Sequence, residues 1–452
     1  MLSIAIILTF VIGYSLIVME HPLKLDKTVP TLLMAAVMWS LLSIGFNHGL
    51  LDIVDTHEHL WNISVGEEAH EGFVSNLVHH LGKTSEILFF LMGAMTIVEI
   101  IDLHAGFEVL KSYVKTKNKK KLLWMVGFIA FFLSAVIDNL TATIVLVTLL
   151  RKLIHSKKER LWYAALIVIA ANAGGAWSPI GDVTTTMLWI GNKTTAGGLI
   201  VELLLPSLVS FVIPFFIATL LPVFKGDLTP SEEDENGKKL LSSKVMLYLG
   251  LGMIIFVPFF KTITHLPPYL GMMFSLGIVW LVSEYIHPEE NFDNKNRHLY
   301  SGLRALSRIE LSSILFFLGI LMAVASLETL ATENMGTLKY LATVLQHSIP
   351  NQYVVISILG VFSAIIDNVP LVAATMGMYT FPIDHHLWHF IAYAAGTGGS
   401  MLIIGSAAGV AAMGMEKIDF IWYFKKVSIL AVLGYVAGIV TFILWSVMFL
   451  HG

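Results

Sequence analysis

The chain has 452 residues, of which 56% are hydrophobic and 13% are charged, well below the charged share of about 25% in soluble domains. This composition indicates a polytopic membrane protein. Because the chain has no cysteine, disulfides, thiolate metal sites and cysteine nucleophiles are excluded, and a formal net charge of −4 provides no basic surface for nucleic acid.

Ten apolar stretches are long enough to cross a bilayer as helices, since about 20 residues span its hydrocarbon core. They lie at 2–19, 29–46, 84–101, 160–191, 199–224, 245–260, 267–286, 310–330, 389–413 and 427–450. The first has neither a basic segment before it nor a small-residue cleavage site after it, so we expect a retained membrane helix rather than a signal peptide. Residues 1–46 therefore form two N-terminal transmembrane helices.

Residues 47–83 form an external insert with six histidines and six acids. A solvated loop is the simplest interpretation, and a surface tuned to protons or cations is an alternative. A zinc site at His57 and His59 would need further ligands, and the chain has neither an HExxH helix nor a cysteine partner to supply them.

A short string occurs twice, as Ser-Ala-Val-Ile-Asp-Asn at 134–139 and as Ser-Ala-Ile-Ile-Asp-Asn at 363–368. Two glycine-rich strings follow at 171–182 and 395–406, with nearly the same spacing. This pattern indicates an internal duplication. The predicted units are repeat 1 at 84–224 and repeat 2 at 310–450, joined at 225–309 by a cytoplasmic linker, two transmembrane helices and a second cytoplasmic loop.

Two further apolar stretches, 122–150 and 352–382, are too long for one crossing, and each carries its Asp-Asn pair in the middle. Lys and Arg cluster on both sides of the first stretch, at 111–121 and 151–160, which places both of its ends in the cytoplasm. We therefore expect a re-entrant hairpin there. The second stretch has sparse flanking charge and should enter from outside.

An odd number of crossings between the starts of the two repeats inverts the second copy. The predicted fold is thus an all-α polytopic membrane protein of two inverted-topology repeats, each with a re-entrant hairpin and a broken transmembrane helix. The predicted breaks are at Gly174, Gly175, Pro179 and Gly181 in one helix and at Gly396, Gly398, Gly399 and Gly405 in the other. Close helix packing by small residues is the alternative explanation.

Asp138 and Asp367 lie inside apolar stretches, where an Asp costs roughly 2.5 to 3.5 kcal/mol on insertion scales. The alternative to a transport role is a structural carboxylate satisfied by backbone donors. The neighbouring polar groups offer oxygens, which hard cations prefer, and no Lys or Arg lies in 122–150, 171–182, 352–382 or 395–406. These features predict a cationic substrate.

The candidate ion-binding residues of repeat 1 are Asp138, Asn139, Thr141, Asn172, Ser178, Asp182 and Thr184. Those of repeat 2 are Asp367, Asn368, Thr397, Ser400 and Ser406. Repeat 2 has lost most of the oxygen-bearing side chains at equivalent positions, so we expect the main Na⁺ site in repeat 1, at Asp138, Asn139, Ser178 and Asp182.

The paired Ile-Asp-Asn strings and the Gly-Gly…Ile-Gly-Asp segment resemble those of the NhaD-type sodium/proton antiporters of the ion transporter superfamily, across residues 84–450. The resemblance implies export of Na⁺ or Li⁺ in exchange for H⁺ without a cofactor, a bacterial inner membrane, and a homodimer with a moving transport part. Arsenite-efflux pumps share the glycine pattern, so anion or arsenite efflux is the nearest alternative. A membrane-embedded hydrolase with Asp138 and Asp367 as an acid dyad is the third.

Overall fold

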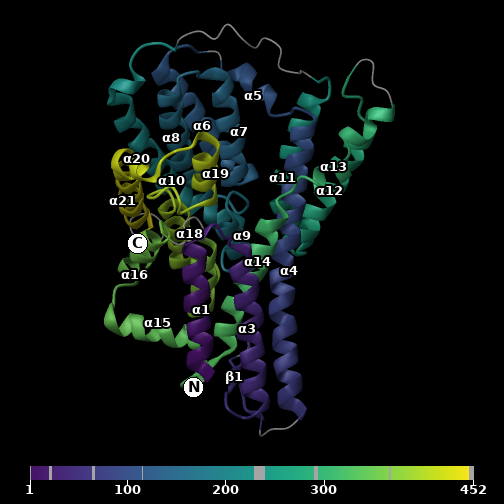
Figure 1. The fold of residues 1–452 in the computed structure, drawn as a ribbon, viewed down its shortest axis with the longest axis vertical. Helices are drawn as coiled ribbons and strands as arrows, with labels where there is room; N and C mark the ends of the chain where they lie inside the picture. Colours follow the sequence, from purple (N-terminus) through teal and green to yellow (C-terminus); the bar gives the residue numbers. More distant parts are fainter. Residues whose placement is uncertain are drawn as a thin grey trace. The chain divides into compact units, whose positions relative to one another are not determined.

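The structure is a computed structural model that describes residues 2–19, 23–56, 58–63, 67–114, 116–228, 240–289, 294–365 and 368–446. The chain divides into two compact units. Unit 1 comprises 1–89, 310–355 and 369–382, and unit 2 comprises 90–309, 356–368 and 383–452. Each unit is described by itself below (Figure 1).

Unit 1 is a small helical bundle with two short hairpins. Its elements are α1 (Leu2–Val18), α3 (Thr28–Asn47), β1 (Ile53–Val54), β2 (Leu60–Trp61), α14 (Leu311–Thr329), β3 (Ala331–Thr332), β4 (Met335–Gly336) and α15 (Thr337–Ser348). The strands pair antiparallel, β1 with β2 and β3 with β4. Helices α3 and α14 approach closely at Gly319, where a side chain would collide with Thr31.

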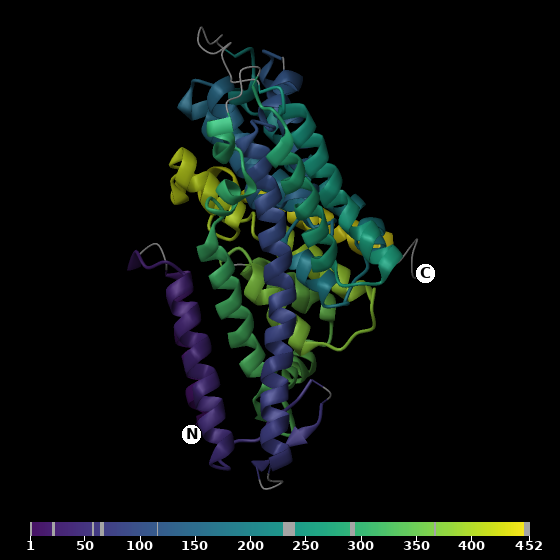
Figure 2. The ribbon, with the colours of Figure 1, turned by 90° about the vertical axis from the view of Figure 1, so that its right-hand side faces the viewer.

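Three helices have residues in both units. They are α4 (Glu67–Leu103), α16 (Gln352–Phe362) and α17 (Asn368–Met378). Figure 2 shows α4 as one continuous helix.

Unit 2 holds the remaining helices. They are α5 (Glu108–Tyr113), α6 (Lys119–Ile137), α7 (Asn139–Leu153), α8 (Lys157–Gly175), α9 (Val183–Ile190), α10 (Ala196–Leu220), η2 (Pro222–Phe224), α11 (Ser243–Thr264), α12 (Pro268–Tyr285), η3 (Asn294–Leu299), α13 (Gly302–Leu306), α18 (His386–Gly398), α19 (Ala407–Glu416), α20 (Phe420–Lys426) and α21 (Ser428–Trp445). Helix α8 lies at the centre and packs on α6, α7, α10, α18 and α19. All of its residues from Tyr163 to Gly175 are buried.

Helices α10 and α21 lie side by side (Figure 1), and small residues lie at their contact. Gly434 lies against the Ser210 carbonyl, and Gly438 lies against Tyr393 and the Pro206 carbonyl. Small residues let helix backbones approach closely, which is the usual way that helices associate in membranes.

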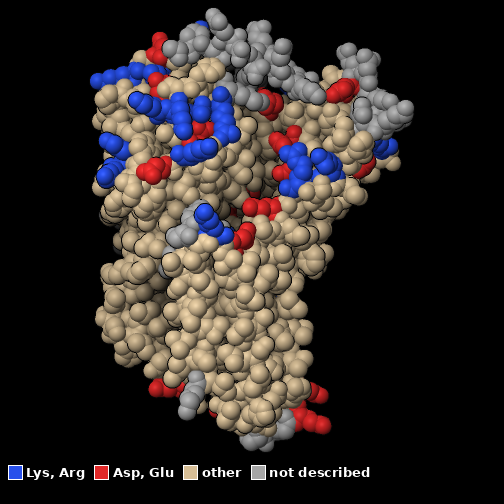
Figure 3. Space-filling model, viewed as in Figure 1, with Lys and Arg blue, Asp and Glu red and all other residues tan. Residues whose placement is uncertain are grey.

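The prediction of a polytopic membrane protein is confirmed at this level, because six helical spans among the described residues are long and apolar enough to cross a membrane. On the face in Figure 3, Lys and Arg of unit 2 gather toward one end of that unit. Residues 229–239 of the predicted cytoplasmic linker, which begins at residue 225, lie outside the described residues.

The loop prediction for the insert is wrong in its second half, because α4 begins at Glu67 rather than near residue 84. The helix buries Ala69, Phe73, Asn76 and His80 in one stripe, at the three- and four-residue spacing of a helix face. Because two of these four residues are polar, the average hydrophobicity of the segment does not reveal the buried helix face. Asn76 Nδ2 donates to Thr329 Oγ1 at 3.0 Å, which ties this part of α4 into unit 1.

Candidate functional site

The predicted helix interruptions are present in unit 2. Helix α8 ends at Gly175 and α9 begins at Val183, while α18 ends at Gly398 and α19 begins at Ala407. Helices α6 and α7 pack on each other and are separated by Asp138 alone. Such interruptions free backbone and side-chain polar groups at the helix ends, and the polar residues of the candidate site gather there.

Asp182 lies at the centre of this polar network and is 2% exposed. Its Oδ1 caps α9 by accepting from the Thr184 amide at 2.8 Å and the Thr184 hydroxyl at 2.7 Å. Its carboxylate also accepts from Asn139 Nδ2, and from Asn368 Nδ2 at 3.2 and 3.3 Å. The two Asn side chains come from the two repeated strings, so both copies contribute to one buried carboxylate.

Asn172 extends the network to α18 and α19. Its Oδ1 accepts from Asn139 Nδ2 at 3.0 Å, and its Nδ2 donates to Ser400 Oγ and Ser406 Oγ, both at 2.9 Å. Ser406 also caps α19 by accepting from the Gly409 amide at 3.1 Å. Asn172 is fully buried, so its hydrogen bonds compensate the cost of removing an amide group from water.

Asp138 occupies a strained backbone position, with φ 77° and ψ 156°. This region is almost restricted to glycine and costs on the order of 1 to 3 kcal/mol for other residues. The half-buried carboxylate accepts from the Thr141 amide at 2.8 Å and the Thr141 hydroxyl at 2.9 Å, and so caps α7. The strain indicates that the surrounding helices fix this residue in place.

Matched contacts recur in the two repeated segments. Ser134 Oγ donates to the Ala171 carbonyl at 2.6 Å, and Ser363 Oγ donates to the Ala395 carbonyl at 2.8 Å. Gly174 lies against the Phe131 carbonyl as Gly398 lies against the Gly360 carbonyl. Asp182 and Ser406 cap their helices with nearly the same backbone angles. Ser134 and Ser363 stand in the repeated string, but their helix-tying role needed the structure to be seen.

Other predicted residues have different partners. Ser178 Oγ donates to the Ala135 carbonyl at 2.5 Å and holds the loop between α8 and α9 against α6. Thr397 Oγ1 donates to the Tyr393 carbonyl one turn back on its own helix. Asp367 lies outside the described residues.

The described residues contain no group of three His, Asp, Glu or Cys side chains that could hold a metal ion. The network is instead built of the Asp182 carboxylate among amide and hydroxyl groups, and Asp138 directly precedes its member Asn139 in the chain. Asn139 and Asn368 turn their NH₂ groups to Asp182, so their oxygens can coordinate a hard cation once the amide groups flip. A carboxylate can hold a proton in place of the cation.

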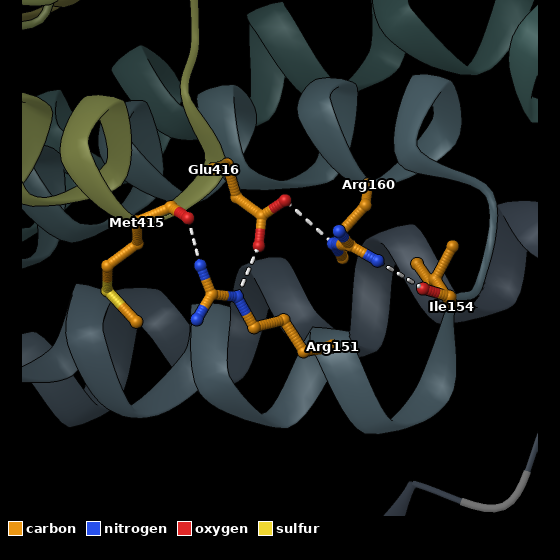
Figure 4. Close-up of polar contacts among 5 residues, drawn as sticks. All are labelled: Arg151, Ile154, Arg160, Met415 and Glu416. Atoms are coloured by element: carbon orange, nitrogen blue, oxygen red, sulfur yellow. Dashed lines mark hydrogen bonds and ion pairs between the residues drawn. The ribbon is translucent and has the colours of Figure 1, made fainter.

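A second polar cluster lies at the ends of α7, α8 and α19 that are opposite to the network. The sequence pattern did not indicate this cluster. Glu416 closes α19 and pairs with Arg151 of α7 and Arg160 of α8, as Figure 4 shows. Glu416 lies far from both repeated strings, 134–139 and 363–368, in the sequence.

The family described as "Citrate transporter" matches residues 14–388. Among curated proteins, "Sodium/proton antiporter 2" of Arabidopsis thaliana is 45% identical over 96% of this chain and 98% of its own length. "Sodium/proton antiporter 1" of the same plant is 46% identical over 98% of this chain and 72% of its own length. "Na(+)/H(+) antiporter NhaD" of Alkalimonas amylolytica is 31% identical over 95% and 88%. The chain therefore belongs to the NhaD-type sodium/proton antiporters, within the wider family that is described as citrate transporter.

Proposed function

We propose that the chain is a secondary Na⁺/H⁺ antiporter, which moves Na⁺ or Li⁺ out against protons. One observation carries the proposal: the buried Asp182 carboxylate accepts from amides of both repeated strings, Asn139 and Asn368. The relatives' names agree with this activity.

The network and Asp138 would couple the two fluxes by competition. Asp182 is buried among neutral hydrogen-bond donors, and the half-buried Asp138 accepts from Thr141. A cation or a proton would balance the negative charge of each carboxylate, so the two compete for the same groups. In the cation-bound state, Asn139 and Asn172 turn their carbonyl oxygens toward the ion, as hard cations require. In the protonated state the carboxyl groups donate to those same oxygens.

An estimate of depth supports a site near the middle of the membrane. Asn139 begins α7, and Arg151 lies twelve residues further along it, which is about 18 Å at 1.5 Å per residue. Half of the hydrocarbon core is about 15 Å. If the Lys- and Arg-rich ends of α6, α7 and α8 lie at the cytoplasmic surface, the network lies near the midplane.

The matched contacts of the two segments support the inverted-repeat arrangement, with 122–150 and 352–382 as re-entrant hairpins. In such folds, alternating access moves one part of the protein around a midplane site. We keep the fold units of the sequence interpretation and a homodimer as parts of this proposal. A bacterial inner membrane is also a proposal, because the relatives include plant proteins as well as bacterial ones.

The test is an exchange assay in liposomes that contain the purified chain and a preformed pH difference. Addition of Na⁺ or Li⁺ should dissipate that difference, while K⁺ and choline serve as controls. Dissipation by arsenite or citrate and not by Na⁺ would favour the anion alternative. No response to any of them, with the protein folded and inserted, would reject both transport proposals.

A further inference from the structure

Glu416 is a buried carboxylate held by two guanidinium groups. Its side chain is 1% exposed, and its Oε1 and Oε2 accept from Arg151 Nε and Arg160 Nε, each at 2.7 Å. Arg151 also donates to the Met415 carbonyl, and Arg160 Nη1 donates to the Ile154 carbonyl at 3.0 Å (Figure 4). The three charged side chains join the last turn of α19 to α7 and α8.

This cluster fixes the end of α19 firmly. Glu416 is buried, whereas Arg151 is 45% exposed and Arg160 is 18% exposed. Loss of either arginine would therefore leave the buried carboxylate with less compensation for its charge. The Arg151 guanidinium also lies at the C-terminus of α19, where a cation complements the helix dipole. Since α19 has only ten residues, a displacement of its end carries over to its beginning.

The opposite ends of the same three helices carry the polar network. Asn139 begins α7, Asn172 lies near the end of α8, and Ser406 caps α19. In α7, twelve residues or about 18 Å separate Asn139 from Arg151, and the same length in α8 separates Arg160 from Asn172. In α19, ten residues or about 15 Å separate Ser406 from Glu416. The nearly equal lengths let the ion cluster and the network clamp the three helices at both ends.

We propose that Glu416 is a positioning residue for the cation site, which it never touches. Its ion pairs set the register of α19 against α7 and α8, and thereby place Ser406 on Asn172 and Asn172 on Asn139. The inference rests on the proposed antiport and adds a determinant of cation affinity to it.

Unit 2 offers a control cluster of three charged side chains, which is more exposed than the cluster of Glu416. Arg308 pairs with Glu99 at 2.9 Å and with Asp102 at 2.7 Å, so it too joins three charged side chains. Neither α4, which carries both acids, nor the segment of Arg308 contributes a residue to the network. Loss of this cluster should therefore leave the cation site unchanged.

The experiment compares Glu416→Gln with Arg308→Gln in reconstituted liposomes, as the half-saturating Na⁺ concentration at fixed pH. That concentration does not depend on how much folded protein is present, so a merely structural role would not move it. We expect Glu416→Gln to raise it roughly five- to fiftyfold, which corresponds to about 1 to 2.3 kcal/mol, the scale of one or two hydrogen bonds of the network. Arg308→Gln should leave it within about twofold of the wild type.

A second variant covers the case in which Glu416→Gln does not fold. Glu416→Gln with Arg160→Gln removes a positive charge together with the carboxylate, so it relieves the buried charge but not the loss of register. The half-saturating concentration should remain raised in this double variant. A wild-type value in either Glu416 variant would overturn the positioning role, whereas a wild-type protein without Na⁺ exchange would overturn the proposed function itself.

Discussion

Replacement of Asp182 by Asn tests the network most directly. The two carboxylate oxygens have different main partners. Oδ1 accepts both bonds from Thr184, and Oδ2 accepts from Asn139 and Asn368. An Asn has one acceptor oxygen. If that oxygen keeps the Thr184 bonds, the new NH₂ group faces the NH₂ groups of Asn139 and Asn368. The Asn139 bond is then lost, and Asn368 keeps only its 3.3 Å contact with the remaining oxygen.

The loss can be estimated from these contacts. A hydrogen bond to a charged group contributes about 1.5 to 3 kcal/mol, and the loss of the Asn139 bond alone is of that size. These bonds hold the network in the absence of a cation, so their loss lowers the stability of the fold. The Na⁺ affinity falls because the variant has no negative charge with which to hold the cation. We therefore expect Asp182→Asn to abolish Na⁺-dependent dissipation of the pH difference at moderate Na⁺ concentrations, and to lower the thermal midpoint in detergent by several degrees.

Asp419→Asn is the matched control, because Asp419 also caps a helix of unit 2, by accepting from the Trp422 amide at 2.8 Å. Asn and Asp are nearly equal as N-caps, so capping alone predicts that both variants are tolerated. If Asp182→Asn exchanged Na⁺ for protons as well as Asp419→Asn does, Asp182 would be only a helix cap and the proposed site would be refuted.

Three further predictions concern single residues. Asp138→Asn should abolish Na⁺-dependent proton movement with little change in expression, because Asn keeps an acceptor for α7; retained exchange, measured in the same liposomes, would remove Asp138 from the site. Ser406→Ala should raise the half-saturating Na⁺ concentration at least as much as Ser178→Ala does. The reason is that Ser406 accepts from Asn172, while Ser178 donates to a backbone carbonyl. A larger effect of Ser178→Ala would favour a site confined to repeat 1. For Asp384, burial raises the pKa, but hydrogen bonds from His389 and Thr195 outweigh it and lower the pKa to about 2. Its ionised form therefore stabilises the fold above about pH 4 and loses this contribution as the pH falls toward 2, so the difference in thermal midpoint between wild type and Asp384→Asn should vanish over that interval, and a difference independent of pH would contradict the assignment.

The sequence alone determined the class of the protein and the places where its helices break. Long apolar stretches require helices in a bilayer, because every backbone polar group must be paired within its own segment. Glycine and proline between Gly174 and Gly181 weaken a helix locally, and the break lies there in the structure. The family followed from the two short Asp-Asn strings and the glycine pattern after them.

The sequence could not determine where α4 begins, because the buried face of Ala69, Phe73, Asn76 and His80 is half polar. Its polar side chains, Asn76 and His80, form hydrogen bonds with Thr329, which is distant in the chain. For the same reason the partners of each polar group stayed hidden. Amide and hydroxyl groups are satisfied by whichever side chain the fold brings within about 3 Å, and Asn172 meets Ser400 and Ser406 more than 200 residues away. The tertiary structure alone decided that Asn139 and Asn368, from the two repeated strings, share one network. It also decided that Glu416 meets two arginines at the far end of the helices that carry this network.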